Sequence, residues 1–195
     1  PALKEVQAVI LCPTRELCLQ ITNEIQSFAV NMPKTWILAV YGGSSIRDQI
    51  FALRKGVQII VATPGRLMDL YRKETLDLRQ VKTLILDEAD RLMDMGFMPQ
   101  LRELQETMPQ KKQNLLFSAT FHDVVERLSE EFLDFPVKIE VNVDMMVIDL
   151  VDQYLYRVPN AKTKLNLLVH LLRIHEDYSR VLIFARTRET AENIH

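Results

Sequence analysis

Six apolar runs of strand length recur along the chain, and each is apolar throughout instead of alternating with polar residues. They read VQAVILCP, TWILAVYGG, VQIIVATP, VKTLILDE, QNLLFSAT and, much later, SRVLIFART. Continuous apolar character is typical of strands that are buried on both faces of a parallel sheet. The runs therefore predict a sheet of parallel strands.

Segments with helical spacing lie between several of these runs. Apolar residues fall on one helical face in three places, after PTRE, after DMG and after TFHD. These residues are Leu17, Ile21, Ile25 and Phe28, then Phe97, Leu101, Leu104 and Met108, and finally Val125, Leu128 and Phe132. A strand followed by a helix, repeated along the chain, is the pattern of a doubly wound α/β domain.

The most informative polar residues follow directly after the strands. The five ends read CPTRE, YGG, ATPGR, LDEAD and FSAT. In open α/β sheets, ligands bind outside the carboxyl ends of the strands, so the ends of neighbouring strands would converge along one edge. Turn and cap residues alone would explain any single end, but they account poorly for all five together.

Three carboxylates, Asp87, Glu88 and Asp90, stand where the run VKTLIL ends. Such a cluster suits Mg²⁺, which prefers oxygen ligands and often keeps most of its waters. We expect Asp87 on the metal side, and Glu88 to orient and deprotonate a water that attacks a phosphate. Asp90 could hydrogen-bond the hydroxyl of Ser118 or Thr120. The alternative is a solvated acidic turn that caps the next helix.

The amino-acid composition is consistent with the predicted α/β domain and limits the classes of protein that remain. A chain of 195 residues, 48% hydrophobic and 26% charged, is typical of a globular protein with one domain and the start of another. No apolar run approaches the ~20 residues of a membrane span, and no leader is recognisable, so we expect a cytoplasmic protein. The net charge of -2 means that any nucleic-acid binding would come from local groups.

Cysteine and histidine do not indicate a metal site. Cys12 and Cys18 form no C-x-x-C pair, and the four histidines show no zinc spacing. We therefore expect free thiols in a reducing compartment.

Taken together, the motifs resemble those of DEAD-box RNA helicases and stand in the order and spacing of that family. The matches are DEAD at Asp87–Asp90, SAT at Ser118–Thr120, PTREL at Pro13–Leu17, the pair Gly42 and Gly43, TPGR at Thr63–Arg66 and VLIFARTR at Val181–Arg188. The wording DEADRLMDMGF and QNLLFSATF is most similar to the bacterial RhlE-like branch.

The resemblance implies a RecA-like fold and an RNA helicase driven by ATP with Mg²⁺. Asp87 would engage Mg²⁺ through water, Glu88 would activate the hydrolytic water, and Asp90 would couple the ATP site to Ser118 and Thr120. The residues on the RNA side would be Pro13, Thr14, Arg15, Gly43, Thr63, Pro64, Gly65 and Arg66. Such contacts read the RNA backbone and the 2′-OH, so we expect little sequence specificity.

Two of these residues have a plainer interpretation. Arg15 and Arg66 each open a helix, where an arginine can merely pair with an acid. For Arg15, the adjacent Glu16 is one candidate partner.

The family's P-loop, G-x-x-x-x-G-K-[ST], is missing. None of the five glycines is followed by lysine and then serine or threonine. The adenine-reading segment and the late arginine-finger motifs are missing with it. We therefore expect an internal piece of a longer ATPase, and we expect the piece alone to be inactive.

The matches also set expected domain boundaries. Residues 1–142 would be a first RecA-like domain without its opening elements, 143–150 a linker, and 151–195 the start of a second RecA-like domain. In this last part we expect a strand in VDQYLYRV, a helix with Leu165, Leu168 and Leu172 on one face, and a strand in SRVLIFART. These 45 residues are too few to close a core. A monomer is the expectation.

Two other classes of function stay open. One is a DNA translocase of the same fold, which DEAD in place of DEAH, together with PTREL and SAT, disfavours. The other is a non-enzymatic module that binds RNA or a protein partner. The presence of Glu88 disfavours this module for a longer parent protein.

Overall fold

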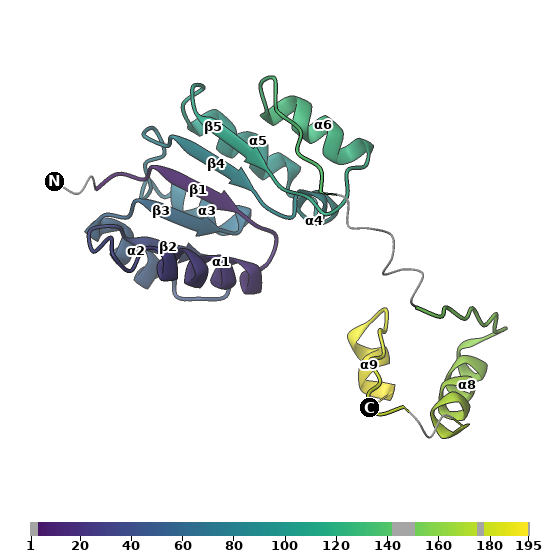
Figure 1. Ribbon diagram of the computed structural model, residues 1–195. Coiled ribbons are helices and arrows are strands. Elements are labelled where there is room, and N and C mark those ends of the chain that lie inside the picture. Colours follow the sequence, from purple (N-terminus) through teal and green to yellow (C-terminus); the bar gives the residue numbers. More distant parts are fainter. Residues whose placement is uncertain (1–3, 142–150, 175–177, 195) are drawn as a thin grey trace. The chain divides into compact units, whose positions relative to one another are not determined.

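The computed structural model describes residues 4–141, 151–174 and 178–194, with elements labelled as in Figure 1. The chain divides into two compact units, Pro1–Lys138 and Ile139–His195. Within the described ranges, no helix is both long and apolar enough to cross a lipid bilayer.

The first unit contains a five-stranded sheet in which all strands are parallel, as the apolar runs predicted. The strands are β1 (Ala8–Leu11), β2 (Ile37–Val40), β3 (Ile59–Ala62), β4 (Thr83–Leu86) and β5 (Gln113–Leu116), in the spatial order β2-β3-β1-β4-β5. The register aligns Leu11 with both Ala62 and Leu86, so the three central strands end level with one another. Five of the six apolar runs thus form strands, as predicted.

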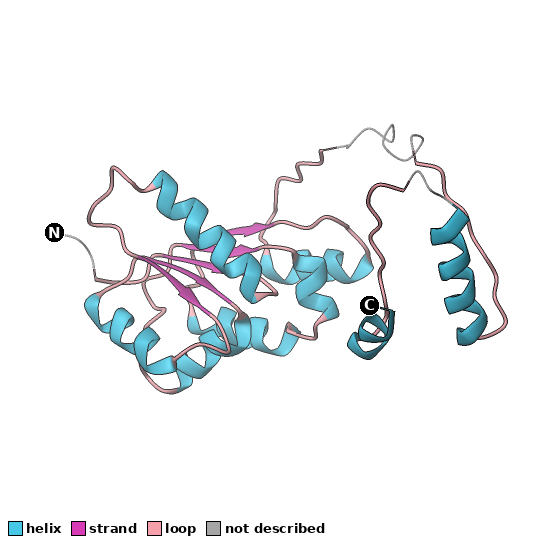
Figure 2. Cartoon of the chain, turned by 90° about the horizontal axis from the view of Figure 1, so that it is seen from below, coloured by secondary structure: helices cyan, strands magenta, loops and turns pink. Residues whose placement is uncertain are grey.

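Helices connect the strands and lie on both faces of the sheet (Figure 2). They are α1 (Arg15–Phe28), α2 (Ile46–Lys55), α3 (Pro64–Arg72), α4 (Ala89–Asp94), α5 (Met98–Thr107) and α6 (Asp123–Phe132). The chain steps one way across the sheet from β1 to β2 and the other way afterwards. Because parallel crossovers are right-handed, such a reversal puts α1 on one face and the later helices on the other. This is the expected doubly wound arrangement.

Alternation of side chains along the strands divides the core into two clusters. Val9, Ile60 and Leu84 belong to the larger cluster, which contains buried residues of α3, α5 and α6. Ile10 and Val61 belong to the smaller cluster, under α1. The predicted apolar faces of α5 and α6 both pack into the larger cluster, as expected.

The predicted face of α1 is correct except at its end. Leu17, Ile21 and Ile25 pack against the smaller cluster, whereas the Phe28 side chain is 82% exposed. At ~1.5 Å per residue, this helix is roughly 21 Å long, whereas a four-residue strand covers only about 13 Å. The last turn of α1 thus extends past the strands that could cover Phe28.

The described part of the second unit contains α8 (Ala161–Ile174) and α9 (Arg188–Ile194) but no strand. The predicted helix is confirmed, and the strands predicted in VDQYLYRV and SRVLIFART are wrong for this structure. A strand gains its backbone hydrogen bonds from a neighbouring strand and its apolar packing from a core. Neither is present, since no residue in 151–174 or 178–194 is buried. The linker predicted at 143–150 lies outside the described residues.

Candidate functional site

The five strand ends lie along one edge of the sheet, with all the arrowheads of Figure 1 pointing the same way. The ladder of backbone hydrogen bonds continues past the strands and ties their ends together. These bonds run from the Cys12 N–H to the Ala62 oxygen (3.0 Å), from Asp87 to Leu11 (2.9 Å), and from Phe117 to Leu86 (2.8 Å). Residues that follow different strands are therefore held at fixed spacing.

Asp87 is the first acid of the edge and is half-buried. Burial raises the pKa of its carboxyl, and the nearby charge of Glu88 adds to this effect. The Glu88 backbone N–H opposes it by donating to Asp87 Oδ1 at 2.9 Å. No described lysine or arginine forms an ion pair with Asp87, so a cation at this carboxylate would be favoured.

The donor set fits Mg²⁺ held through water. Within the described ranges, no group of three or more acidic, cysteine or histidine side chains could form a protein cage for a metal. Mg²⁺ commonly binds through one or two carboxylates together with waters and substrate phosphates. Asp87 supplies the one carboxylate that this mode of binding needs.

Glu88 adopts a left-handed backbone conformation, with φ 48° and ψ 54°, at the start of α4. For a residue with a Cβ, this conformation costs roughly 1–2 kcal/mol and persists only when the surroundings enforce it. Here the Ala89 N–H donates to the Phe117 oxygen at 3.0 Å, and the Leu92 N–H donates to the Glu88 oxygen at 2.9 Å. The turn is thus fixed from both β5 and α4.

Arg91 is a member of the site that sequence reasoning missed. Its Nη1 donates to Glu88 Oε2 at 2.9 Å, which leaves Glu88 Oε1 outside this ion pair. Spacing of three residues on a helix brings such side chains together and is the signal that could have found it.

Asp90 connects the end of β4 to the end of β5. Its Oδ2 accepts from Thr120 Oγ1 at 2.8 Å and from the Thr120 N–H at 3.1 Å. Its own N–H donates to Ser118 Oγ at 3.3 Å, and that hydroxyl donates to the Thr120 oxygen at 2.7 Å. The expected contact between Asp90 and these hydroxyls is present. Whether it couples two activities stays a prediction.

These hydrogen bonds also set the charge state of Asp90. Burial raises the pKa of its carboxyl, but the bonds from Thr120, from the Arg91 N–H and from Ser118 outweigh burial and lower that pKa overall. The carboxylate is therefore ionised near neutral pH.

Arg15 lies beside the end of β2. Its guanidinium carbon is 5.0 Å from the centre of the Tyr41 ring, a cation–π contact. Gly43 has φ 83°, and a Cβ added there would lie 3.9 Å from Arg15 Nη1. No ion pair between Arg15 and Glu16 is present among the described residues, so the plainer interpretation of Arg15 fails.

Arg66 joins the end of β3 to the loop after β2. Its Nη1 donates to the Ser44 carbonyl oxygen at 3.1 Å and to Gln49 Oε1 at 3.2 Å. Gln49 and Ser44 were not singled out from the sequence. Neither acceptor is charged, so for Arg66 too the pairing with an acid is not found among the described residues.

The remaining predicted residues divide into buried and accessible ones. The rings of Pro13 and Pro64 are buried, so these residues shape the two turns. Thr14 caps α1 by accepting the Leu17 N–H at 3.2 Å, whereas the Thr63 side chain makes no cap hydrogen bond. A Cβ added at Gly65 would meet nothing within 4 Å, so the backbone there is open to a ligand.

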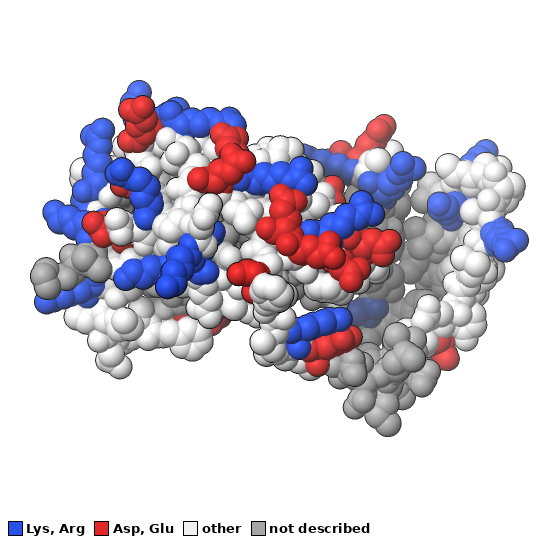
Figure 3. Space-filling view, turned by 90° about the horizontal axis from the view of Figure 1, so that it is seen from above, with Lys and Arg blue, Asp and Glu red and all other residues white. Residues whose placement is uncertain are grey.

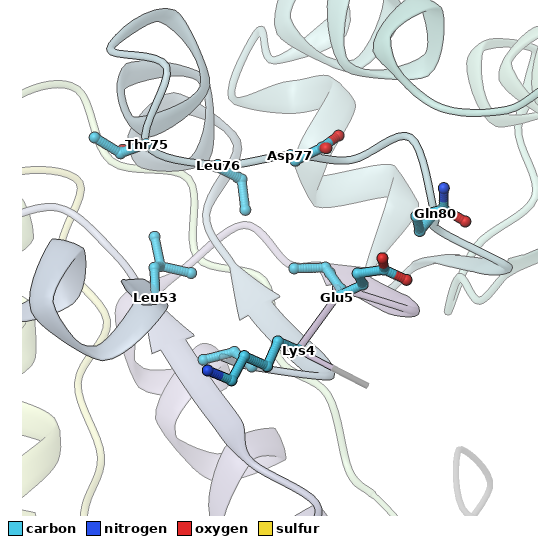
Figure 4. Close-up of a pocket in the computed structure, with 9 residues that line it drawn as sticks. Lys4, Glu5, Leu53, Thr75, Leu76, Asp77 and Gln80 are labelled. Carbon is cyan, nitrogen blue, oxygen red and sulfur yellow. The ribbon is translucent and has the colours of Figure 1, made fainter. Parts of the chain in front are cut away.

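A pocket of about 200 Å³ lies away from this edge (Figure 4). Its walls include Glu5, Val57 and Gln80, which precede β1, β3 and β4, so the pocket sits at the amino ends of the strands. None of the residues predicted for the site lines it. The candidate site is therefore the carboxyl edge.

Positive charge near the site comes from individual basic side chains. Basic and acidic side chains are interspersed on the face in Figure 3, and the formal net charge is -2. Because the net charge is slightly negative, an anionic ligand would depend on individual donors such as Arg15 and Arg66.

Comparison with known proteins identifies the family. Residues 1–128 match the model of the DEAD/DEAH box helicase family. Over 189 residues the chain is 36% identical to the DEAD-box ATP-dependent RNA helicase CshA of Streptococcus pneumoniae, covering 97% of this chain and 36% of the relative. It is 37% identical over 190 residues to the RNA helicase CrhR of Synechocystis, covering 97% and 38%. It is 39% identical over 193 residues to the pre-mRNA-processing ATP-dependent RNA helicase prp-5 of Neurospora crassa, covering 96% and 16%.

The chain thus spans well under half the length of these relatives. It belongs to the DEAD/DEAH box helicase family, and its parallel sheet with flanking helices is the RecA-like fold that the motifs predicted. The assignment to a RhlE-like branch stays a prediction.

Proposed function

We propose that this chain is part of an ATP-dependent RNA helicase that uses ATP hydrolysis to remodel RNA duplexes or RNA–protein complexes. One observation carries the proposal. The acid pair Asp87 and Glu88 shares one sheet edge with exposed donors, and Asp90 bonds that acid pair's turn to Ser118 and Thr120. The groups proposed for phosphate hydrolysis and those proposed for binding a polyanion therefore share one edge of the sheet.

On the nucleotide side, Glu88 is the proposed general base. With Arg91 on Oε2, the other carboxylate oxygen can accept a proton from a water aligned with the terminal phosphate. Asp87 would hold Mg²⁺ through water. The ion, when bound, neutralises charge on the phosphates. Enforced backbone strain at Glu88 supports this role, because such strain often accompanies a functional site.

On the RNA side, Arg15 and Arg66 supply guanidinium donors, and Thr14 and Thr63 supply hydroxyls. The backbone at Gly65 is open, and a Cβ added at Gly43 would meet only Arg15 Nη1, so a phosphate could approach both glycines closely. Pro13 and Pro64 act through the shape of their turns. None of these groups reads a base edge, so the proposed binding has little sequence specificity.

We propose that the phosphate cradle comes from residues outside these 195, since the sequence contains no P-loop. The arginine fingers are proposed to lie outside them too. We propose a monomeric, cytoplasmic protein. The similar proteins of Streptococcus pneumoniae, Synechocystis and Neurospora crassa are named as RNA helicases, which supports RNA over DNA as the nucleic acid.

The test compares nucleic acids in a longer protein that contains this chain and a P-loop. ATP hydrolysis should rise with single-stranded RNA and much less with DNA of the same sequence. Equal stimulation by both would support a DNA translocase instead. RNA binding without any hydrolysis would support the non-enzymatic module.

A further inference from the structure

We propose that Gln49 is a positioning residue that holds the Arg66 guanidinium ready for an RNA phosphate without neutralising its charge. This inference rests on the proposed function and deepens it. It adds a residue of α2 to a surface that otherwise consists of strand ends.

Gln49 is buried where a glutamine is costly. Its side chain is only 5% exposed, and among the described residues the other buried polar side chains are Thr22 and Ser129. A buried amide is stable only if its donors and acceptor find partners. Burial of the Gln49 side chain therefore predicts that its amide makes hydrogen bonds to neighbouring groups.

Those hydrogen bonds define the orientation of the Gln49 amide. Its Nε2 donates to the Tyr41 carbonyl oxygen at 3.2 Å and to Ser44 Oγ at 2.5 Å. Its Oε1 accepts from Arg66 Nη1 at 3.2 Å. Turning the amide over would set its NH₂ group against the guanidinium and its oxygen against the Tyr41 oxygen. The carbonyl is thus locked toward Arg66.

Arg66 is held differently from other arginines of the chain. Among the described residues, its two acceptors are the Ser44 carbonyl and Gln49 Oε1, and both are neutral. Five other arginines instead form ion pairs with carboxylates: Arg72, Arg79, Arg91, Arg102 and Arg188. A guanidinium fixed by neutral acceptors keeps its full charge, so it can still attract an anion.

The remaining donors of Arg66 define the class of ligand. Nη1 is occupied, while Nε and Nη2 make no hydrogen bond to any described residue. These N–H groups form the edge that binds a phosphate or carboxylate through two parallel bonds. Backbone at Gly42 and Gly65 is open, since a Cβ at either would meet nothing within 4 Å. A backbone phosphate of RNA fits this arrangement.

The competing explanation is that Gln49 only closes the loop after β2. Two substitutions separate the explanations. Gln49→Glu keeps the size of the side chain and puts a carboxylate on Arg66, which neutralises it, at the cost of the two bonds that Nε2 donates to Tyr41 and Ser44. Gln80→Glu makes the same change of charge at the opposite edge of the sheet and serves as the control.

RNA affinity of the chain is measured by fluorescence anisotropy over a range of salt concentrations. We expect Gln49→Glu to weaken binding about tenfold and to lower the slope of log affinity against log salt by about one. Gln80→Glu should change affinity less than about twofold, and Gln49→Glu should add little when Arg66 is already Ala. Equal losses in both glutamate variants, or the same loss without Arg66, would overturn the inference.

A second measurement needs no RNA. Rotation of the Arg66 guanidinium about its Nε–Cζ bond, followed by NMR, should be slow in the unaltered chain and faster in Gln49→Met. Unchanged rotation would also overturn the inference. If the unaltered chain bound no RNA yet showed slow rotation that depends on Gln49, the proposed RNA surface would fail and the positioning role would stand.

Discussion

Asp90 Oδ2 receives two hydrogen bonds from a single residue, Thr120, one from its hydroxyl at 2.8 Å and one from its backbone N–H at 3.1 Å. The two residues lie 30 positions apart, at the ends of the neighbouring strands β4 and β5. Because the bonds hold both the side chain and the backbone of Thr120, a shift of the acidic turn must move the end of β5 with it.

Removing the Ser118 and Thr120 hydroxyls should weaken the contact between Asp90 and Thr120 while the chain still folds. In Ser118→Ala combined with Thr120→Ala, the Thr120 N–H bond remains while the hydroxyl bonds are lost. We expect the free energy of unfolding to fall by about 1–3 kcal/mol. In a longer protein with a P-loop, duplex separation should fall more than ATP hydrolysis. Thr107→Ala, whose hydroxyl bonds only within α5, is the control. A proportional loss of both activities would indicate simple destabilisation.

Acid should weaken the same link. Hydrogen bonds lower the pKa of Asp90 below its ordinary value of 3.8, so ionised Asp90 stabilises the folded state above that value. This contribution is lost as pH falls through the lowered folded pKa. The difference in unfolding free energy between the unaltered chain and Asp90→Asn should therefore be constant near neutral pH and shrink below about pH 4. A difference that grew in acid, or one matched by the exposed control Asp94→Asn, would contradict the role of these bonds.

Glu88→Gln tests the proposed general base. The amide keeps the shape of the side chain but cannot take a proton. Losing a positioned base typically costs about 10²–10⁴-fold in rate. In a longer protein with a P-loop, RNA-stimulated ATP hydrolysis should fall by this factor, while ATP binding is largely spared. Unchanged steady-state turnover would refute the assignment, and Glu130→Gln on the exposed side of α6 should be without effect.

The two thiols should be inert in the folded chain. Cys12 and Cys18 are both fully buried and unbonded to each other as a disulfide. The hydrogen bond with the Cys18 thiol, burial and the charges of Asp87 and Glu88 raise the pKa of Cys12 well above its usual range.

The same hydrogen bond lowers the pKa of Cys18, so it is burial that protects both thiols from a reagent. Reaction with an aromatic disulfide reagent should therefore be at least about a hundredfold slower than in denaturant. A cysteine placed at exposed Ser27 should react quickly under the same conditions. Equal rates for the native and unfolded chain would contradict the buried placement of both thiols.

The 195-residue chain by itself should show no ATPase activity, with or without RNA. Phosphoryl transfer depends on several positioned groups that act together. Asp87 and Glu88 are present, but the printed sequence has no P-loop to hold the phosphates. Hydrolysis that rose with RNA and vanished in Glu88→Gln would contradict this expectation.

Much of the first unit could be predicted from the sequence because its signals are local. A strand buried on both faces must be apolar throughout, so a run such as the one ending at Leu86 can be recognised as a buried strand from its residues. A residue that follows such a strand must lie at its carboxyl end, so Asp87 and Glu88 were found at once. Asp90, Ser118 and Thr120 were predicted in the same way, because they follow the ends of two apolar runs.

Other structural features depend on contacts with segments distant in the sequence, which a local pattern of residues does not predict. Both strands predicted after residue 151 failed because the described part of that unit offers neither a pairing strand nor a core. Phe28 fits a helical face and yet is exposed, because the strands end before the helix does.

Gln49 shows the same limit at the site. In the sequence it is one polar residue of an amphipathic helix, where glutamine is ordinarily solvated. Only the packing of α2 beside the ends of β2 and β3 buries its amide and brings it to Arg66. Local sequence is enough to tell which strand ends carry acids, hydroxyls and guanidinium groups. Which of these groups touch depends on the fold, because hydrogen bonds depend on distances between segments that lie far apart along the chain.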